Sequence, residues 1–472
     1  MSTPAPALLA PQELGPQDGP PATARRARHA LVALLTAAGL GSVLFWALAV
    51  GDGGPTADPA GLPAPGRLVE WGLPVVTLAG RIAAVGTVGT LLFAAVLLPG
   101  RSAELPAAFR RALRATTAWA LAWVTATALG AILTLSRLLG TGPTELSWAS
   151  LRVFVEDTGA GRAALLGVVL VAVVAATASR CTVVGARALL AVALTALVLP
   201  VVLSGHTSAA EDHLAAVSTL GVHVVAATVW IGGLLAVLVH GRRGAALTMV
   251  APRYSRLALA CFVATALSGV LAAWLVLGGV GAVLDALGTG YGALLVAKSA
   301  GLILLGVLGW QHRRRTLPRL RAGDGGGFRR FAAGEVLLML ATVAVAVALA
   351  SSPPPAGAAP AGPSAGTAVT APAAPADGEA ADPMAGHDHG ELSVGVLVDD
   401  ERFHVAGAVA AGSRVTVFNS GDETVTLTAD DGSFDLVVPA GSLTTFKAPD
   451  QPGDHPFTSG HSAAFADVLV VE

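Results

Sequence analysis

Two histidines and two carboxylates fall within eight residues of one another in a short segment of this chain. The segment runs from Ser204 to His213 and contains His206, Glu211 and Asp212. Imidazole and carboxylate groups together suit Cu(II), zinc, nickel or iron. The pattern predicts a loop that gathers a divalent metal ion. The simpler interpretation is a polar loop before a helix, with Asp212 stabilising the first turn.

A deeper histidine follows the same segment. Asp212 and His223 are eleven residues apart, which is about three helical turns, so both would lie on one helix face about 16 Å apart. The spacing predicts a route by which an ion passes from the loop to a buried imidazole. An interhelical hydrogen bond made by His223 is the alternative.

A second small cluster, His387-Asp388-His389, stands in a tract rich in Pro, Ala and Gly. Paired imidazoles beside a carboxylate in such a tract predict a weak metal-capture site, and a solvated linker with chance histidines is the alternative. The chain has only four methionines, so a copper site here would depend on histidine, which favours Cu(II) or a mixed site.

The composition requires a membrane around most of this chain. Hydrophobic residues make up 54% of it and charged residues only 13%, about half the fraction in a soluble domain. Nine apolar stretches each approach the ~20 residues that cross a bilayer, and they must be helices because lipid offers the backbone no hydrogen-bond partner. The stretches are 29–50, 73–98, 116–135, 163–178, 188–203, 214–239, 257–277, 292–310 and 331–350.

Arginines indicate on which side of the membrane each loop lies. Twenty fall in one alternating set of loops and four in the other set. Because basic residues are retained on the cytoplasmic side, the N-terminus is predicted to be cytoplasmic and the C-terminus, after nine crossings, outside. The two cysteines, Cys181 and Cys261, are then expected near cytoplasmic helix ends as reduced thiols.

Three further ionisable residues interrupt the apolar stretches: Arg81, Lys298 and Glu335. A charged side chain inside a membrane helix costs roughly 2.5–3.5 kcal/mol on insertion scales, so each needs a reason. Snorkelling to the interface or static pairing is the simpler explanation. Buried Lys298, together with His223, is one of the features that favour a transporter.

The chain divides into a membrane part and a β-rich part. We predict a disordered cytoplasmic N-terminus (1–28), transmembrane helices one to five (29–200), a core of helices six to nine (201–350), a linker (351–390) and an extracytoplasmic domain (391–472). In the last segment, short alternating runs separated by Gly, Asp and Pro predict an antiparallel β-sandwich. The expected fold is an all-α polytopic membrane bundle with a small C-terminal β-sandwich.

Several short patterns follow one another between residues 200 and 355. They are Ser204-Gly205-His206, His223 with Trp230-Ile231-Gly232-Gly233-Leu234, Tyr254-Ser255-Arg256, Ser268-Gly269-Val270 with Trp274, Tyr291-Gly292 with Lys298, Gln311-His312-Arg313-Arg314-Arg315, Glu335, and Ser352-Pro353-Pro354. In this order they resemble the core of the copper resistance D (CopD) family, whereas residues 29–200 match by helix count alone. The resemblance implies copper uptake or copper tolerance at the plasma membrane. It points to His206, His223, Trp230, Gly232, Gly233, Lys298 and Glu335, while Asp212 and His213 are added from position.

The C-terminal segment resembles a cupredoxin that has lost its copper ligands. The runs 415–419, 439–441, 452–457 and 468–471 fit that plan. A blue-copper site needs two histidines, a cysteine and usually a methionine. The domain has no cysteine, no histidine next to Asn419 at the strand where a cupredoxin ligand is expected, and no methionine after His461. Electron transfer is therefore not expected. A different metal site made by His404, His455 and His461, or a protein-contact role, stays open.

These observations predict a membrane protein that handles copper at a bacterial plasma membrane. The expected partners are copper ions, lipids and an extracytoplasmic copper-binding protein, with no nucleic acid. The sequence contains no nucleotide-binding loop, aspartyl-phosphate motif or nucleophile elbow, so no enzymatic activity is expected. A membrane haem or electron-transfer protein and a scaffold for assembling a copper enzyme are the alternatives.

Overall fold

Long apolar helices form the body of the protein. The computed structural model describes residues 22–51, 66–98, 105–203, 210–241, 244–277, 280–316, 326–352, 394–398, 402–405, 407–419, 421, 423–440, 442–460 and 465–472. Within these ranges, nine helices are long and apolar enough to cross a membrane, and each coincides with one predicted stretch. The predicted polytopic helical bundle is confirmed.

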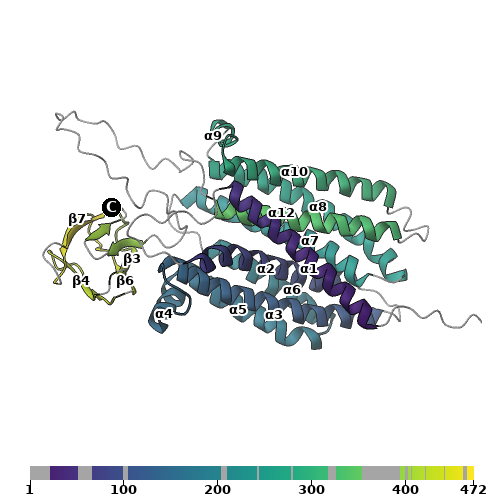
Figure 1. The fold of residues 1–472 in the computed structure, drawn as a ribbon, viewed down its shortest axis with the longest axis horizontal. Coiled ribbons are helices and arrows are strands. Elements are labelled where there is room, and N and C mark those ends of the chain that lie inside the picture. The colour runs from purple at the N-terminus through teal and green to yellow at the C-terminus, as the bar shows by residue number, and fades with distance from the viewer. Residues whose placement is uncertain are drawn as a thin grey trace, which may run out of the picture.

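The nine spanning helices alternate in direction (Figure 1). They are α1 (Ala22–Val50), α2 (Arg67–Leu92), α3 (Leu105–Leu138), α5 (Gly159–Thr177), α6 (Val183–Leu203), α7 (Ala210–His240), α8 (Gly244–Leu277), α10 (Gly290–Gln311) and α12 (Gly326–Ser351). Short helical segments join or extend them: η1 (Phe93–Leu97), α4 (Trp148–Asp157), η2 (Ala178–Arg180), α9 (Val280–Ala286) and η3 (His312–Thr316).

Helix α8 begins earlier than the sequence predicted. It starts at Gly244 rather than near residue 257, so Cys261 lies buried in the middle of a helix and not near its end. The polar run 253–256 lies inside the helix, and Arg253 donates to the carbonyl of Leu97, 3.1 Å away. Arg187 of α6 likewise donates to Ala95, so two arginines serve the free carbonyls of the π-helical turn η1.

Helix α2 is the centre of the bundle, and it packs against α3, α6, α7 and α12. In its most apolar stretch 78% of the residues are buried, against 17% in α8 and α10. Small residues allow α2 to pack this closely. A Cβ on Gly89 would collide with the backbone of Gly232 on α7, and a Cβ on Gly232 would collide with the backbone of Val85. Gly233 faces the ring of Tyr254, whose atoms would lie 2.7 Å from a Cβ. The Gly-Gly pair after Trp230 therefore serves close helix packing.

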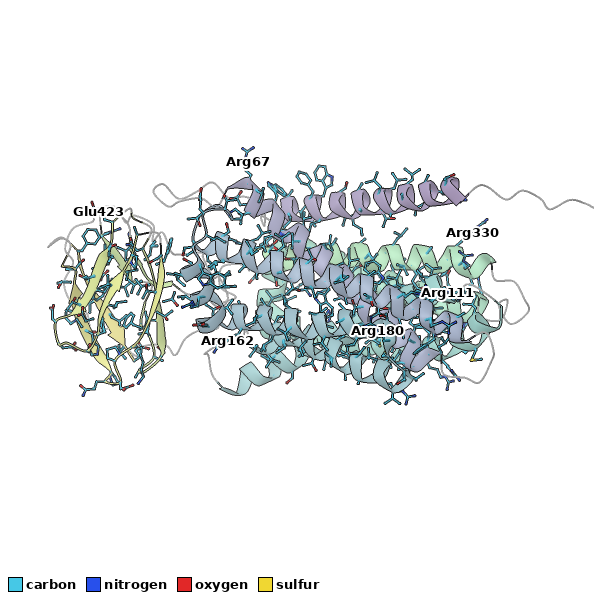
Figure 2. All side chains as sticks on the ribbon, turned by 90° about the horizontal axis from the view of Figure 1, so that it is seen from below. Arg67, Arg111, Arg162, Arg180, Arg330 and Glu423 are labelled. Carbon is cyan, nitrogen blue, oxygen red and sulfur yellow. The ribbon has the colours of Figure 1, made fainter. Side chains whose placement is uncertain are left out.

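The two ends of the bundle differ in charge. Arg111, Arg180 and Arg330 lie at one end, called here the arginine-rich end, whereas Arg67 and Arg162 lie at the end that carries the β-rich domain (Figure 2). The bundle thus separates the two loop sets as the arginine pattern predicted. Which end faces the cytoplasm stays a prediction.

The C-terminal domain is a two-layer β-sandwich. Its strands are β1 (Val394–Val398), β2 (Phe403–Val405), β3 (Arg414–Asn419), β4 (Val425–Ala429), β5 (Asp435–Val438), β6 (Leu443–Lys447), β7 (Gly453–Thr458) and β8 (Ala466–Val471). The sheets have the orders β2-β1-β3-β6 and β5-β4-β7-β8. One expectation was wrong: β1 and β3 pair in parallel, because β2 folds back onto the other edge of β1.

An apolar contact joins the sandwich to the bundle. Leu397, Phe418 and Leu443 of the first sheet share one cluster of buried residues with the end of α3 and with Phe154 of α4. Helix α4 begins at the cap of Ser147, whose hydroxyl accepts from the Ser150 amide at 3.0 Å, and it packs against β6. In Figure 1 the sandwich lies beside α4.

The α2–α7 contact yields a test of the packing. We expect Gly232→Ala to destabilise the protein by about 1–3 kcal/mol, because its methyl group would collide with backbone atoms that cannot move aside. Thermal unfolding in detergent and size-exclusion chromatography measure the effect. Gly334→Ala is the matched control, since nothing lies within 4 Å of its Cβ position. Equal stability of the two variants would contradict the packing role of Gly232.

Candidate metal-handling site

His223 lies inside α7 and is fixed by α8. Its Nδ1 is 3.1 Å from the hydroxyl of Ser268, and that hydroxyl donates to the carbonyl of Ala264 at 2.6 Å. The imidazole also interacts with the backbone of Thr265. The Ser268 hydroxyl donates its proton to the Ala264 carbonyl, so its oxygen can only accept from the imidazole. The proton of His223 is therefore on Nδ1, and the lone pair is on Nε2. This tautomer is the one that can ligate a metal ion, and a partner on the other nitrogen is typical of metal-binding histidines.

Gly269 makes room for the ring of His223. A Cβ at this position would lie 3.4 Å from Cε1 of the imidazole. The Ser268-Gly269 pair therefore supplies both the acceptor and the space. Sequence reasoning noted the pair only as part of a pattern, because a contact between residues 45 positions apart leaves no periodic signal.

Two cations lie within electrostatic range of His223. The charges of Lys298 on α10 and Arg81 on α2 both act on its imidazole, and Arg81 also acts on Lys298. Helices α2 and α7 run in the same direction and touch at Gly89 and Gly232. Arg81 and His223 precede these glycines by eight and nine residues, which places both at the same height, about 12–14 Å from the contact. Three of the four predicted intramembrane polar residues thus come together.

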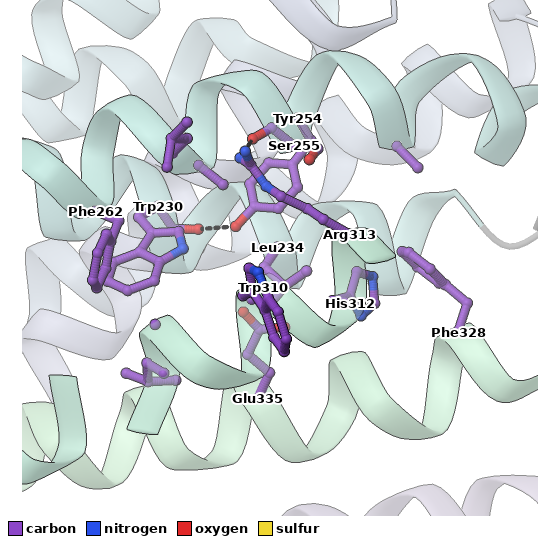
Figure 3. Close-up of a pocket in the computed structure, with 16 residues that line it drawn as sticks. Trp230, Leu234, Tyr254, Ser255, Phe262, Trp310, His312, Arg313, Phe328 and Glu335 are labelled. Atoms are coloured by element: carbon purple, nitrogen blue, oxygen red, sulfur yellow. Dashed lines mark hydrogen bonds between the residues drawn. The ribbon is translucent and has the colours of Figure 1, made fainter. Parts of the chain in front are cut away.

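The fourth, Glu335, lies apart from them. Its carboxyl group lines a cavity between α7, α8, α10 and α12, toward the arginine-rich end (Figure 3). His223 and Trp230, which lines this cavity, are seven residues apart on α7, so the cavity is about 10 Å further along that helix. The sequence did not predict that His312 lines the same cavity.

The remaining predicted metal ligands are only partly covered by the structure. His206, His387 and His389 lie outside the described residues. Asp212 and His213 fall in the first turn of α7, which confirms that Asp212 and His223 belong to one helix. Among the side chains that the structure describes, no three His, Cys, Asp or Glu residues come together as a metal site.

Two family models match the chain. The model of copper resistance protein D matches residues 248–349, and the model of the copper resistance protein D-like N-terminal domain matches residues 68–217. Together they cover more than half of the sequence. The chain belongs to the copper resistance protein D family. No curated protein and no solved structure gives a significant match.

Family membership makes the chain a multi-pass membrane protein of copper handling. Arg81, Asp212 and His213 fall within the N-terminal match, and Lys298 and Glu335 fall within the other. His223 lies in the interval between the two matches, so its role depends on its geometry in this copper resistance D protein. The N-terminal match covers a region where the sequence offered only a helix count.

The β-sandwich uses its best-placed histidine for structure. His455 is buried, with Nδ1 2.6 Å from Asp431 Oδ2 and Nε2 3.0 Å from the carbonyl of Gln451. Both nitrogens face acceptors, so both are engaged in hydrogen bonds within the sandwich. Asn419 is also buried: its amide donates to Glu423 and Val438, and its oxygen accepts from Gly421. The contacts of His455 therefore indicate a structural role, and His461 lies outside the described residues.

The His455–Asp431 pair predicts how the stability of the sandwich depends on pH. The Gln451 carbonyl and then Asp431 raise the pKa of His455, while hydrogen bonds from Ser433 and then His455 lower the pKa of Asp431 to about 2. The histidine's contribution is complete below its ordinary pKa of about 6.5 and is lost as pH rises through the raised value. The aspartate's contribution is present above about 3.8 and is lost as pH falls toward 2.

Hydrogen exchange of residues 394–472 in the full chain should therefore be slowest between about pH 4 and 6.5, after correction for intrinsic exchange. His455→Gln should abolish the loss of protection on the alkaline side, because no proton is then released. His404→Gln in β2 is the control and should keep the wild-type profile. An unchanged profile in His455→Gln would refute the structural assignment.

Proposed function

We propose that this protein moves copper ions across a bacterial plasma membrane. In this proposal the ion enters at the end that carries the β-sandwich, where His206, Asp212 and His213 collect it. It then passes to Nε2 of His223 inside the bundle. Uptake from outside is the favoured direction because the arginine pattern puts that end outside.

The hydrogen bond between His223 and Ser268 is the observation that supports this proposal most. A histidine whose only task was to join α7 and α8 would be satisfied by either tautomer. Here the Ser268 hydroxyl is already committed to Ala264, so the ring proton stays on Nδ1. In this tautomer the remaining nitrogen, Nε2, carries the lone pair and is available to an ion.

The positive charges near His223 favour transient binding of a copper ion over tight storage. Lys298 and Arg81 both act on the imidazole, and neither has a hydrogen-bond or ion-pair partner in the described part of the chain. A copper ion at Nε2 would be repelled by both charges. A transport site must bind its ion weakly enough to release it, and two nearby cations supply that weakness.

Variants of His223 and its partner test this proposal in a graded way. We expect His223→Ala to abolish copper accumulation in cells and Ser268→Ala to lower the copper affinity of the purified protein about 10–100-fold, because the imidazole loses its orientation. Ser268→Thr keeps the hydroxyl and should retain most of the affinity. A chromophoric chelator in competition measures affinity, with His387 and His389 both changed to Ala so that the linker does not contribute.

Thr265→Ala is the matched control for these variants. Its side-chain hydroxyl has no hydrogen-bond partner among the described residues, and its contact with the imidazole is through the backbone. Accumulation and affinity should therefore equal those of wild type. If His223→Ala accumulates copper normally, the proposed path is wrong. A Soret band in the purified protein would favour the haem alternative instead.

Removal of one positive charge near His223 should raise the affinity of the protein for copper. Lys298→Gln removes one cation beside His223, so the copper affinity should rise, roughly tenfold, while transport slows because release becomes harder. Lys447→Gln is the control, since Lys447 is an exposed residue of the sandwich paired with Asp450 at 2.6 Å. Weaker copper binding by Lys298→Gln would show that the ammonium group helps binding and would contradict the repulsion argument.

A further inference from the structure

A second polar site lies beyond His223, in a cavity of about 180 Å³. Figure 3 shows Glu335 on α12 below Trp310, with Trp230 and Phe262 to their left. The polar lining consists of Tyr254, His312, Arg313 and Glu335, together with Ser255. Copper-ligand chemistry alone does not explain this cavity, because just one carboxylate and one imidazole among the described residues line it.

Two of the polar groups that line the cavity donate hydrogen bonds to backbone carbonyls. The Tyr254 hydroxyl donates to the carbonyl of Trp230 at 2.8 Å, and the Arg313 guanidinium donates to the carbonyl of Ser255. Neither group makes a hydrogen bond or an ion pair with Glu335 in the described part of the chain. The other helices that pack on α12, namely α1 and α2, contribute no titratable side chain to the cavity lining.

Glu335 is 6% exposed and has no hydrogen-bond or ion-pair partner among the described residues. A Cβ on Gly309 would lie 3.9 Å from Oε1 of Glu335. A carboxylate that stays charged without a partner in such surroundings is strongly disfavoured, so the group either carries a proton or holds a cation.

His312 is the second unsatisfied group of the cavity. Its side chain is held between Phe328 and Phe331, with ring centroids 4.7 Å and 5.5 Å away, and its buried Nδ1 has no partner among the described residues. A water molecule occupies about 30 Å³ in the liquid, so the cavity has room for several waters between the polar groups.

We propose that Glu335 is a proton-binding site, which takes up and releases a proton through water in this cavity. When the carboxyl group releases its proton, a cavity water accepts it and Glu335 becomes a carboxylate. An imidazole nitrogen of His312 that carries a lone pair is the next acceptor. Titratable groups near Glu335 are Tyr254 on α8 and His312 and Arg313 in η3. The site gives the bundle a proton to exchange against a metal ion, and in that respect it rests on the proposed function.

Carbodiimide labelling of the full wild-type protein tests the site without copper. Dicyclohexylcarbodiimide reacts with protonated carboxyl groups in apolar surroundings, and mass spectrometry locates the label. We expect labelling of Glu335 that falls about tenfold per pH unit above its midpoint, because one proton is lost. An exposed carboxylate, Glu145, which accepts from the Gly142 amide at 2.8 Å, is the internal control and should not be labelled.

Infrared difference spectra between H₂O and D₂O give an independent readout. The band of a protonated, exchangeable carboxyl group should be present in wild type and in Glu145→Gln, and absent in Glu335→Gln. Glu335→Asp keeps a carboxyl group and should restore a band. This second variant keeps the test decisive if Glu335→Gln does not fold. Absence of both label and band in wild type would overturn the proposal. Normal copper accumulation in His223→Ala, which would refute the proposed function, leaves this test unaffected, so the two proposals fail separately.

Discussion

The backbone contact between Gly89 and Gly232 sets the geometry of the membrane part. Helices in lipid gain little from burying apolar side chains, so close approach of their backbones must supply the packing. Here two glycines bring α2 against α7, and the next residue, Gly233, admits the ring of Tyr254 from α8. Three helices are thereby fixed around one point. The heights of Arg81, His223 and Trp230 follow from counting residues away from it.

Polar groups lie at successive depths along α7, and the charges of their surroundings differ. Asp212 lies at its first turn, His223 about 16 Å further on, and the cavity beside Trp230 about 10 Å beyond that. At His223 the neighbours are cations that repel an incoming ion. At the cavity the unpaired group is an acid, Glu335, which needs a cation. Opposite electrostatic requirements at two depths suit the exchange of two positively charged species in a way that a single uniform site would not.

The sequence allowed most of the membrane fold to be predicted and less of its site. The helices were recognisable because lipid imposes long apolar runs, and Arg81, Lys298 and Glu335 stood out because charge is rare inside such runs. Ser268 could not be identified as the partner of His223, since serine is common in helices and the contact depends on the angle between α7 and α8. His312 was noted only within the run 311–315, and the packing of α12 against η3 shows that its ring is enclosed.

In the β-sandwich, a resemblance to copper-binding folds does not by itself identify metal ligands. A histidine buried in a sandwich attached to a copper-handling bundle invites assignment as a ligand, yet both nitrogens of His455 are engaged by acceptors. The surface that the domain commits to the bundle is apolar instead, through Leu397, Phe418 and Leu443. The domain uses His455 for its own stability and packs buried apolar side chains against the end of the bundle. Because burial of these side chains holds the sandwich at that end, these contacts serve attachment to the bundle.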